Sequence, residues 1–156
     1  MQKITSLLST NNLWYETFEH APVKTSEQAA LTRPGYTLRQ GAKAMIVKAY
    51  RTKTETEFVM LVFPADQKFN SDKVRKELGI KNLRFATEQE VSDLTGGVKI
   101  GGVPPFGSLF NLKVYADPSL FENEKIVFNA GDRGFSVAMK SSDYQALINL
   151  QVIDLI

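Results

Sequence analysis

The stretch Gly96-Gly97-Val98-Lys99-Ile100-Gly101-Gly102-Val103-Pro104-Pro105-Phe106-Gly107 holds five of the ten glycines and two of the six prolines of the chain. Glycine lets a backbone adopt positive φ and approach a ligand closely, whereas proline fixes φ and removes an N–H donor. This mixture predicts a shaped loop, because neither residue suits the interior of a helix or strand. Two interpretations stay open: a surface connection, or a stiff loop whose free amides face a substrate carbonyl or phosphate. Val98, Ile100, Val103 and Phe106 are expected to anchor the loop to a core.

Length and composition favour one globular domain over residues 1–156. Hydrophobic residues make up 43% of the chain and charged residues 23%, which is ordinary for a protein with a packed core. No apolar run approaches the roughly 20 residues that span a bilayer, and the first residues turn polar too soon for a signal peptide. Cysteine is absent, so no thiol nucleophile or disulfide is expected. We therefore expect a cytoplasmic protein that does not contact a membrane.

Histidine and charge set limits on the site. His20 is the single histidine, which excludes a site built from several histidines, and we expect neither a metal nor another cofactor. The net charge of +2 is too small to identify a nucleic-acid partner. Basic residues do cluster over residues 43–53 and 68–84. Such clusters are either solvated faces or part of a rim that contacts phosphates.

The remaining segments predict mixed helices and strands. Hydrophobic spacing and capping residues predict helices over 2–10, 25–31, 71–78 and 87–94, and a last helix from Ser141 or Ser142. Ser71 and Thr87 are the expected caps, and Thr25 begins a capping-box pattern. Strands are expected over 13–18, 42–49, 58–63, 83–86, 111–116, 125–129 and 135–139, with a hairpin-like turn over 130–134. No regular alternation of strand and helix runs through this order, so the prediction is an α+β fold.

Two side chains, Lys43 and His20, are candidates for a functional role from the sequence pattern alone. Lys43 shares the face of its predicted strand with Met45 and Val47. A lysine on an apolar face either extends to the rim or projects into a cavity where its charge serves an anion. His20 precedes a turn, where it is either a half-buried histidine bonded to backbone or a catalytic group. The pattern does not choose between these roles.

Several chemistries find no support in the sequence. No serine lies on a Gly-x-Ser-x-Gly elbow, and no Gly-x-x-x-x-Gly-Lys phosphate loop is present. What remains is a loop with free amides and one well-placed lysine. That combination suits the binding of an ester carbonyl and an anionic neighbour, with water as the nucleophile.

Three segments in order carry a family resemblance: residues 42–47, residues 101–107 and residues 129–136. Together they resemble the YbaK / prolyl-tRNA synthetase insertion-domain (ProX-like) family, whose members are aminoacyl-tRNA deacylases. Residues 19–25 also resemble the segment in which many members carry a His-x-Pro-Val stretch. The resemblance implies a compact domain with a mixed, largely antiparallel and partly barrel-like sheet flanked by helices.

The resemblance also implies roles for named residues. Lys43 matches the family's functional lysine, and Gly101 to Pro105 match its Gly-x-x-x-Pro loop, so Lys43 and Gly101 are the expected catalytic positions. Ser136 stands where some relatives carry aspartate, so contacts to the amino-acid amine or to the ribose are expected to differ. The expected substrate-binding residues are His20, Thr25, Thr95, Gly102, Val103, Pro104, Pro105, Asn129, Ala130, Gly131 and Ser136.

Two functions follow from the resemblance. One is a trans-editing deacylase that hydrolyses the ester of a mischarged tRNA carrying a small amino acid, with the tRNA for proline as one candidate. The other is a non-catalytic module of the same fold that binds tRNA or regulates. The expected partner is the acceptor end of aminoacyl-tRNA, and an aminoacyl-tRNA synthetase is a candidate second partner.

Overall fold

The computed structural model describes residues 2–21 and 33–156. Thr25 and the helix predicted over 25–31 lie outside these residues. The α-helices are α1 (Gln2–Thr10), α3 (Ser71–Leu78), α4 (Glu88–Thr95) and α5 (Ser141–Leu147). The strands are β1 (Tyr15–Glu19), β2 (Ala42–Tyr50), β3 (Thr56–Pro64), β4 (Asn82–Phe85), β5 (Lys113–Ala116), β6 (Lys125–Asp132), β7 (Phe135–Lys140) and β8 (Leu150–Val152). Three 3₁₀ helices complete the description: η1 (Leu38–Gln40), η2 (Gly107–Phe110) and η3 (Pro118–Glu122).

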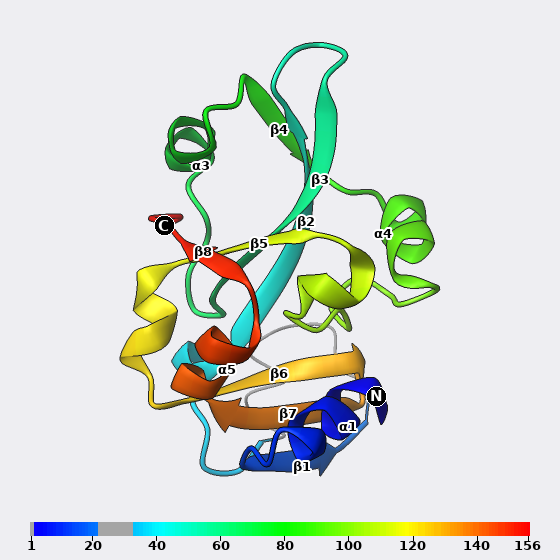
Figure 1. The fold of residues 1–156 in the computed structure, drawn as a ribbon, viewed down its shortest axis with the longest axis vertical. Helices are drawn as coiled ribbons and strands as arrows, with labels where there is room; N and C mark the ends of the chain where they lie inside the picture. Colours follow the sequence, from blue (N-terminus) through cyan, green and yellow to red (C-terminus); the bar gives the residue numbers. More distant parts are fainter. Residues whose placement is uncertain (1, 22–32) are drawn as a thin grey trace.

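The described strands form two sheets and do not close a barrel. One sheet has the order β4-β2-β3-β5-β8, in which β4-β2-β3 are antiparallel and β3-β5-β8 are parallel. The other sheet is antiparallel and has the order β1-β7-β6. In Figure 1 the smaller sheet lies below the long β2–β3 pair. The strands of the smaller sheet run across the direction of β2 and β3. The predicted α+β class and mixed sheet are confirmed.

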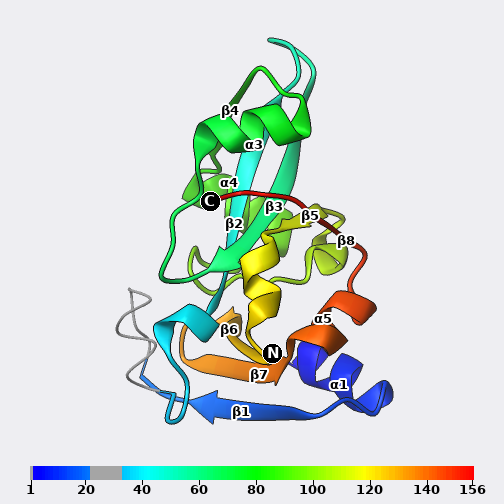
Figure 2. The same cartoon turned by 90° about the vertical axis from the view of Figure 1, so that its left-hand side faces the viewer.

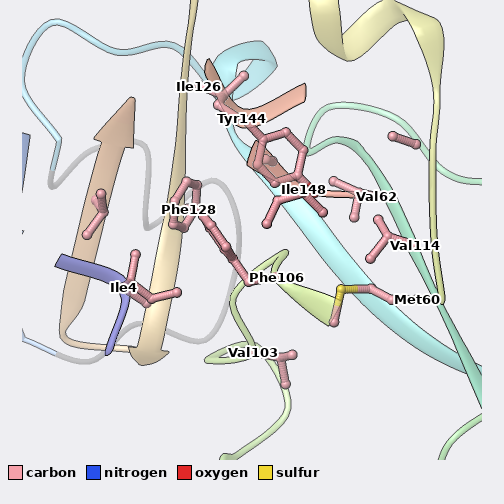
Figure 3. Close-up of a cluster of buried hydrophobic side chains, with 14 of the residues drawn as sticks. Ile4, Met60, Val62, Val103, Phe106, Val114, Ile126, Phe128, Tyr144 and Ile148 are labelled. Carbon is pink, nitrogen blue, oxygen red and sulfur yellow. The ribbon is translucent and has the colours of Figure 1, made fainter. Parts of the chain in front are cut away.

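The larger hydrophobic core takes side chains from both sheets, from α1 and α5, and from the glycine-proline loop. Phe106 of this loop is fully buried, and its ring lies 5.4 Å from that of Phe128 and 5.6 Å from that of Tyr144. Figure 3 shows Phe106 reaching from the loop toward these two residues. Tyr144 also donates a hydrogen bond from its hydroxyl to the carbonyl oxygen of Pro105, at 2.6 Å. The C-terminal end of the loop is therefore fixed to the core.

The middle of β2 is buried on both faces, where Ile46 and Val47 lie. Ile46 belongs to the larger core, whereas Val47 belongs to a second cluster with Val59, Leu61 and Phe63. α3 lies on one side of the β2–β3 pair and α4 on the other (Figure 1), and Figure 2 shows α3 facing the viewer beside this pair. A strand covered on both faces gives a rigid base for a site at its edge.

Local sequence signals predicted some element boundaries correctly and others wrongly. Thr87 and Glu90 form the predicted capping box of α4, with both reciprocal hydrogen bonds present. The predicted serine cap of α3 is wrong, because Asn70 is the cap and its side-chain oxygen accepts from the backbone N–H groups of Asp72 and Lys73. The predicted turn over 130–134 is too long, since β6 continues to Asp132 through an irregularity after Asn129. β8 was not predicted from the sequence.

Among the described residues, no helix is long and apolar enough to cross a membrane.

Candidate functional site

The glycine-proline loop begins where α4 ends. Gly96 closes α4 with φ of 73°, Gly97 has φ of 104°, and Gly101 has φ of 91°. Positive φ is the conformation that favours glycine, so these positions require the residue that the sequence provides. Val98, Val103 and Phe106 pack on the core as predicted. Ile100 does not, because 44% of its surface is exposed.

Among the described residues, several N–H groups of the loop have no acceptor, including those of Gly101 and Val103. The N–H of Gly102 donates to the carbonyl oxygen of Lys99 at 2.9 Å, and the carbonyl oxygen of Gly102 accepts from the N–H of Gly131 at 2.8 Å. Within the described residues no acceptor engages the N–H of Gly101 or Val103. The arrangement suits the loop interpretation in which free amides face a substrate carbonyl.

A cavity of about 290 Å³ lies beside this loop. Its walls come from β2, from the end of β4 and the residue after it, from α4, and from the loop. The lining residues are Ala44, Met45, Ile46, Phe85, Ala86, Val91, Ile100, Gly101 and Val103. All nine are apolar residues or glycine, so polar contacts to a ligand inside the cavity would come from backbone groups or from the rim.

One wall of the cavity is a stretch of the β2 edge that no neighbouring strand of the described residues covers. β4 pairs with β2 only from Val47 to Tyr50, and the N–H of Ala86 bonds to the carbonyl oxygen of Ile46. In an antiparallel ladder, alternate residues point their N–H and C=O groups to the same side. The backbone groups of Ala44 therefore point toward the same edge as those of Ile46, and no strand of the described residues covers them there.

Lys43 lies on β2 opposite Phe63 of β3, next to the cavity-lining residue Ala44. Its side chain is exposed, and no described carboxylate forms an ion pair with it. Strand alternation puts Lys43 on the same face as Met45, which lines the cavity. Lys43 thus lies on β2 beside the cavity-lining Ala44, with an exposed side chain that has no ion-pair partner among the described residues.

A polar network supports Gly101 from the other sheet. Asn129 on β6 donates from Nδ2 to the carbonyl oxygen of Gly101 at 2.6 Å. The Oδ1 of Asn129 accepts from Arg33 at 2.8 Å and from the hydroxyl of Ser136 at 3.1 Å. His20 Nε2 lies 3.1 Å from the Ser136 hydroxyl, and its Nδ1 lies 3.0 Å from the carbonyl oxygen of Ala21. Three of the predicted residues, His20, Asn129 and Ser136, are therefore brought together and connected to Gly101.

Arg33 belongs to this network and was missed by the sequence analysis. Only 6% of its surface is exposed, and its Nε donates to the Ser136 hydroxyl at 3.0 Å. Burial lowers the pKa of the Arg33 guanidinium to about 10, and no carboxylate of the described residues pairs with it. The sequence carried no signal for this role, because Arg33 precedes Pro34-Gly35 and a break in the chain was the only visible feature. Only the tertiary contacts identify it.

Of the other predicted residues that the structure describes, Val103 lines the cavity and the rest lie in the loop or beside it. Thr95 accepts from the N–H of Val98 and donates to the carbonyl oxygen of Val91, so it closes the end of α4. The N–H of Gly131 donates to the carbonyl oxygen of Gly102. Ala130, next to Gly131 in sequence, is buried. Pro104 and Pro105 are buried behind Val103, which is the member of the three that lines the cavity.

One ion pair holds two walls of the cavity together. Arg84 of β4 donates to both carboxylate oxygens of Glu90 on α4, at 2.7 and 2.9 Å. This hydrogen bonding lowers the pKa of Glu90 to about 2. Phe85 and Ala86 follow Arg84, and Val91 follows Glu90, so the pair fixes the two segments that carry these lining residues. Among the described residues, no group of three or more His, Cys, Asp or Glu side chains is placed to hold a metal ion.

Comparison with known proteins matches residues 20–147 to the model of the aminoacyl-tRNA editing domain. The chain belongs to the aminoacyl-tRNA editing domain family. The matched residues run from His20 to Leu147, so they include Lys43, the glycine-proline loop and the network around Asn129. The resemblance seen in the sequence is confirmed.

Three similar proteins set this family member in context. The chain is 32% identical over 154 residues, covering 98% of this chain and 90% of the relative, to the Escherichia coli K12 protein named multifunctional Ser/Thr-tRNA deacylase ProXp-y. It is 30% identical over 101 residues to the proline–tRNA ligase of Burkholderia ambifaria, covering 65% of this chain and 17% of that longer protein. A solved structure of a protein proposed as a trans-editing enzyme for prolyl tRNA synthetase superposes with a TM-score of 0.81 at 25% identity, covering 99% of this chain and 94% of the other.

Proposed function

We propose that this editing-domain protein is a deacylase that hydrolyses the ester between a small amino acid and the 3′ end of a tRNA. The observation that carries the proposal is the cavity lined by Gly101 and Val103, whose N–H groups have no acceptor among the described residues, with Lys43 next to the lining residue Ala44 on β2. The 32% identity to the Ser/Thr-tRNA deacylase over nearly the whole chain supports the same reaction class.

The geometry suggests how the chain would promote hydrolysis. The amides of Gly101 and Val103 donate to the ester carbonyl oxygen, where negative charge develops as water attacks the carbonyl carbon. The bond from that carbon to the ribose oxygen then breaks, and the ribose oxygen takes a proton, which yields the free amino acid and uncharged tRNA. Lys43 supplies a positive charge near the reacting ester and the adjacent nucleotide. Asn129 holds the peptide plane after Gly101 in place. Its Oδ1 accepts a hydrogen bond from Arg33, and its Nδ2 donates one to the Gly101 carbonyl oxygen.

The cavity favours selection by size. Its lining side chains carry no polar group, so a hydroxyl on the aminoacyl group would be met by loop backbone rather than by a side chain in the cavity. The removal of one methylene changes binding by only about 1–3 kcal/mol, so discrimination among small groups is expected to be modest. We expect seryl, threonyl and alanyl esters to be accepted and large aromatic ones to be rejected.

A non-catalytic tRNA-binding module of the same fold is the alternative. Incubation of the protein with a panel of aminoacyl-tRNAs separates the two, because a pure binder releases no amino acid. Amino-acid release above the spontaneous rate supports the deacylase. Retention of labelled tRNA on the protein without release, for every member of the panel, would favour the binding module.

This proposal extends to the compartment, the partners and the domain organisation of the protein. We propose that the protein acts in the cytoplasm on the acceptor end of aminoacyl-tRNA and that a synthetase, such as the one for proline, is a candidate partner. We also propose residues 1–156 as one editing domain, which is supported by a core that runs from Ile4 to Ile148.

The net charge of the chain is only +2, so we expect tRNA binding to be weak and its dependence on salt concentration to be shallow.

A further inference from the structure

Phe85 is a large aromatic residue whose side chain the fold leaves exposed to solvent. It is 57% exposed and it lines the cavity at the end of β4. The inner wall is different, since Ile46, Ala86 and Val103 are each less than a tenth exposed. Phe85 and the exposed Ile100 therefore form the outer part of the cavity, and the buried residues form its inner part.

The Phe85 ring packs against the ring of Phe69, which in turn packs against a buried ring. Phe69 meets Phe85 edge to face, with centroids 5.6 Å apart and planes at 73°. Phe69 in turn meets Phe63 in the same manner at 6.0 Å, and Phe63 is buried. A ring held in this way presents a flat surface with little loss of side-chain freedom when a ligand stacks on it.

Phe85 and Lys43 lie on the same face of the sheet. Lys43, Met45 and Val47 alternate onto one face of β2, and Val47 is the register partner of Phe85 on β4. Four residues along a strand span about 13 Å, so Lys43 and Phe85 flank Met45 at the two ends of a short track. That length matches an aminoacylated nucleoside laid along the face, with its ester near Gly101.

Three cations adjoin residues that line the cavity, and none of them has a carboxylate partner among the described residues. Lys43 and Lys99 adjoin lining residues in sequence, and the Cδ and Nε atoms of Arg133 lie 3.8 and 3.9 Å from the position that a Cβ would take on Gly101. Within residues 2–21 and 33–156, none of the three forms an ion pair. An aromatic ring beside uncompensated cations is the combination with which proteins bind single-stranded nucleic acid.

We propose that Phe85 is the stacking platform for the terminal base of the tRNA acceptor strand, an inference that rests on the proposed deacylase function. The aminoacyl group then occupies the inner cavity, the ester lies against the Gly101 amides, and the base covers the Phe85 ring. The nearby cations meet the phosphate of the terminal nucleotide. Stacking on a π face is tolerant of base identity, which suits an end that all tRNAs share.

The decisive experiment removes the ring and the base separately. Deacylation is measured on a seryl-minihelix that ends in adenosine and on a matched one whose terminal nucleotide has ribose but no base. Phe85→Ala is expected to lower kcat/KM on the first substrate by about 10-fold, in the range found for base–aromatic stacking. On the substrate without the base, wild type and Phe85→Ala are expected to agree within about 2-fold, because the lost contact is already absent.

Three further variants separate stacking from other effects. Phe85→Tyr keeps the ring and is expected to stay within about 2-fold of wild type. Phe85→Leu keeps apolar area without a π face and is expected to lose activity as alanine does, and it replaces the alanine variant if that one does not fold. Val152→Ala, which also trims an exposed apolar side chain but on β8, is the matched control and is expected to match wild type.

Other occupants of Phe85 give distinct results that would overturn the proposal. If Phe85 holds the aminoacyl side chain, the loss in Phe85→Ala persists on the substrate without the base. If Phe85 contacts a partner protein, Phe85→Ala equals wild type on both minihelices in the absence of that partner.

A binding measurement keeps the two hypotheses separable. An uncharged minihelix with 2-aminopurine as its terminal base is expected to lose fluorescence on wild-type protein and to keep it on Phe85→Ala. Quenching without amino-acid release from any aminoacyl-tRNA would reject the deacylase and retain the base platform. Release of amino acid with equal fluorescence on wild type and Phe85→Ala would retain the deacylase and reject the platform.

Discussion

Asn129 donates from its Nδ2 to the carbonyl oxygen of Gly101 over 2.6 Å, and this bond joins the smaller sheet to the glycine-proline loop. The amide oxygen of Asn129 faces the opposite way and accepts from the buried Arg33. A side-chain amide held at both ends cannot rotate freely, so the peptide plane that follows Gly101 is fixed as well.

Asn129→Ala is expected to lower the deacylation rate by about 10-fold, because loss of the side chain frees the Gly101 carbonyl and leaves Arg33 with one partner fewer. Asn123→Ala is the matched control, since Asn123 also donates to a backbone carbonyl, that of Arg39, but away from the cavity. Single-turnover rates of both variants check this. Equal rates in the two variants would show that the Asn129 bond is not used in the reaction.

Lys43→Ala is expected to lower the rate by about 100-fold, which corresponds to about 2.7 kcal/mol of transition-state stabilisation. The fold should persist because the Lys43 side chain is exposed. Lys48→Ala, on the same strand but with its ammonium over the rings of Tyr50 and Phe58, serves as the control and should stay within about 2-fold of wild type. A Lys43→Ala variant as fast as wild type would remove Lys43 from the mechanism.

Two glycine substitutions should separate activity from stability. A Cβ on Gly101 would meet only the Arg133 side chain at ordinary contact distance, but its φ of 91° strains any other residue. Gly101→Ala is therefore expected to fold and to lose at least about 10-fold in rate, because the loop amides shift from their position. A Cβ on Gly107 would overlap Val114 Cγ2 at 2.5 Å and the Leu112 carbonyl oxygen at 2.6 Å. Gly107→Ala should then lower the free energy of unfolding by about 1–3 kcal/mol.

Denaturation curves and single-turnover rates of both glycine variants test this separation. The account expects a rate defect in Gly101→Ala and a stability defect in Gly107→Ala. Normal activity in Gly101→Ala would mean that the amides of the loop do not position the ester.

The Arg84–Glu90 pair predicts a dependence of stability on acid. Hydrogen bonding to Arg84 lowers the pKa of Glu90 from 4.5 to about 2. A carboxyl with a lowered folded-state pKa stabilises the fold above its unfolded pKa, and the contribution is lost as the pH falls from 4.5 through 2. Urea unfolding between pH 6 and 2 should therefore show a smaller loss of stability in Glu90→Gln than in wild type. Parallel pH profiles of the two proteins would contradict the pair's contribution.

The sequence predicted those features that local chemistry controls. The α4 cap at Thr87 and the anchoring of Phe106 follow from residue type and spacing, and both are confirmed. The family followed from three ordered motifs and is confirmed by the family match. The assigned roles of the site residues stay predictions.

Other features depend on contacts between distant segments. Arg33 reaches Asn129 and Ser136 across about a hundred residues of sequence, so no local pattern could show its burial. Ile100 looked like an anchor because it is apolar, yet the turn at Gly101 leaves it at the cavity mouth. The free edge of β2 arises because β4 is only four residues long and stops at Phe85, which is visible only once the pairing is known.

The most direct test of the account is single-turnover amino-acid release from seryl-, threonyl-, alanyl- and phenylalanyl-tRNA, measured with wild type and with Val103→Ala. The account predicts release from the three small esters, little from the phenylalanyl ester, and a wider range in Val103→Ala because a wall of the cavity recedes. Wild-type protein that releases no amino acid from any of the four, at concentrations where it binds the tRNAs, would contradict the central claim that this cavity is the site of ester hydrolysis.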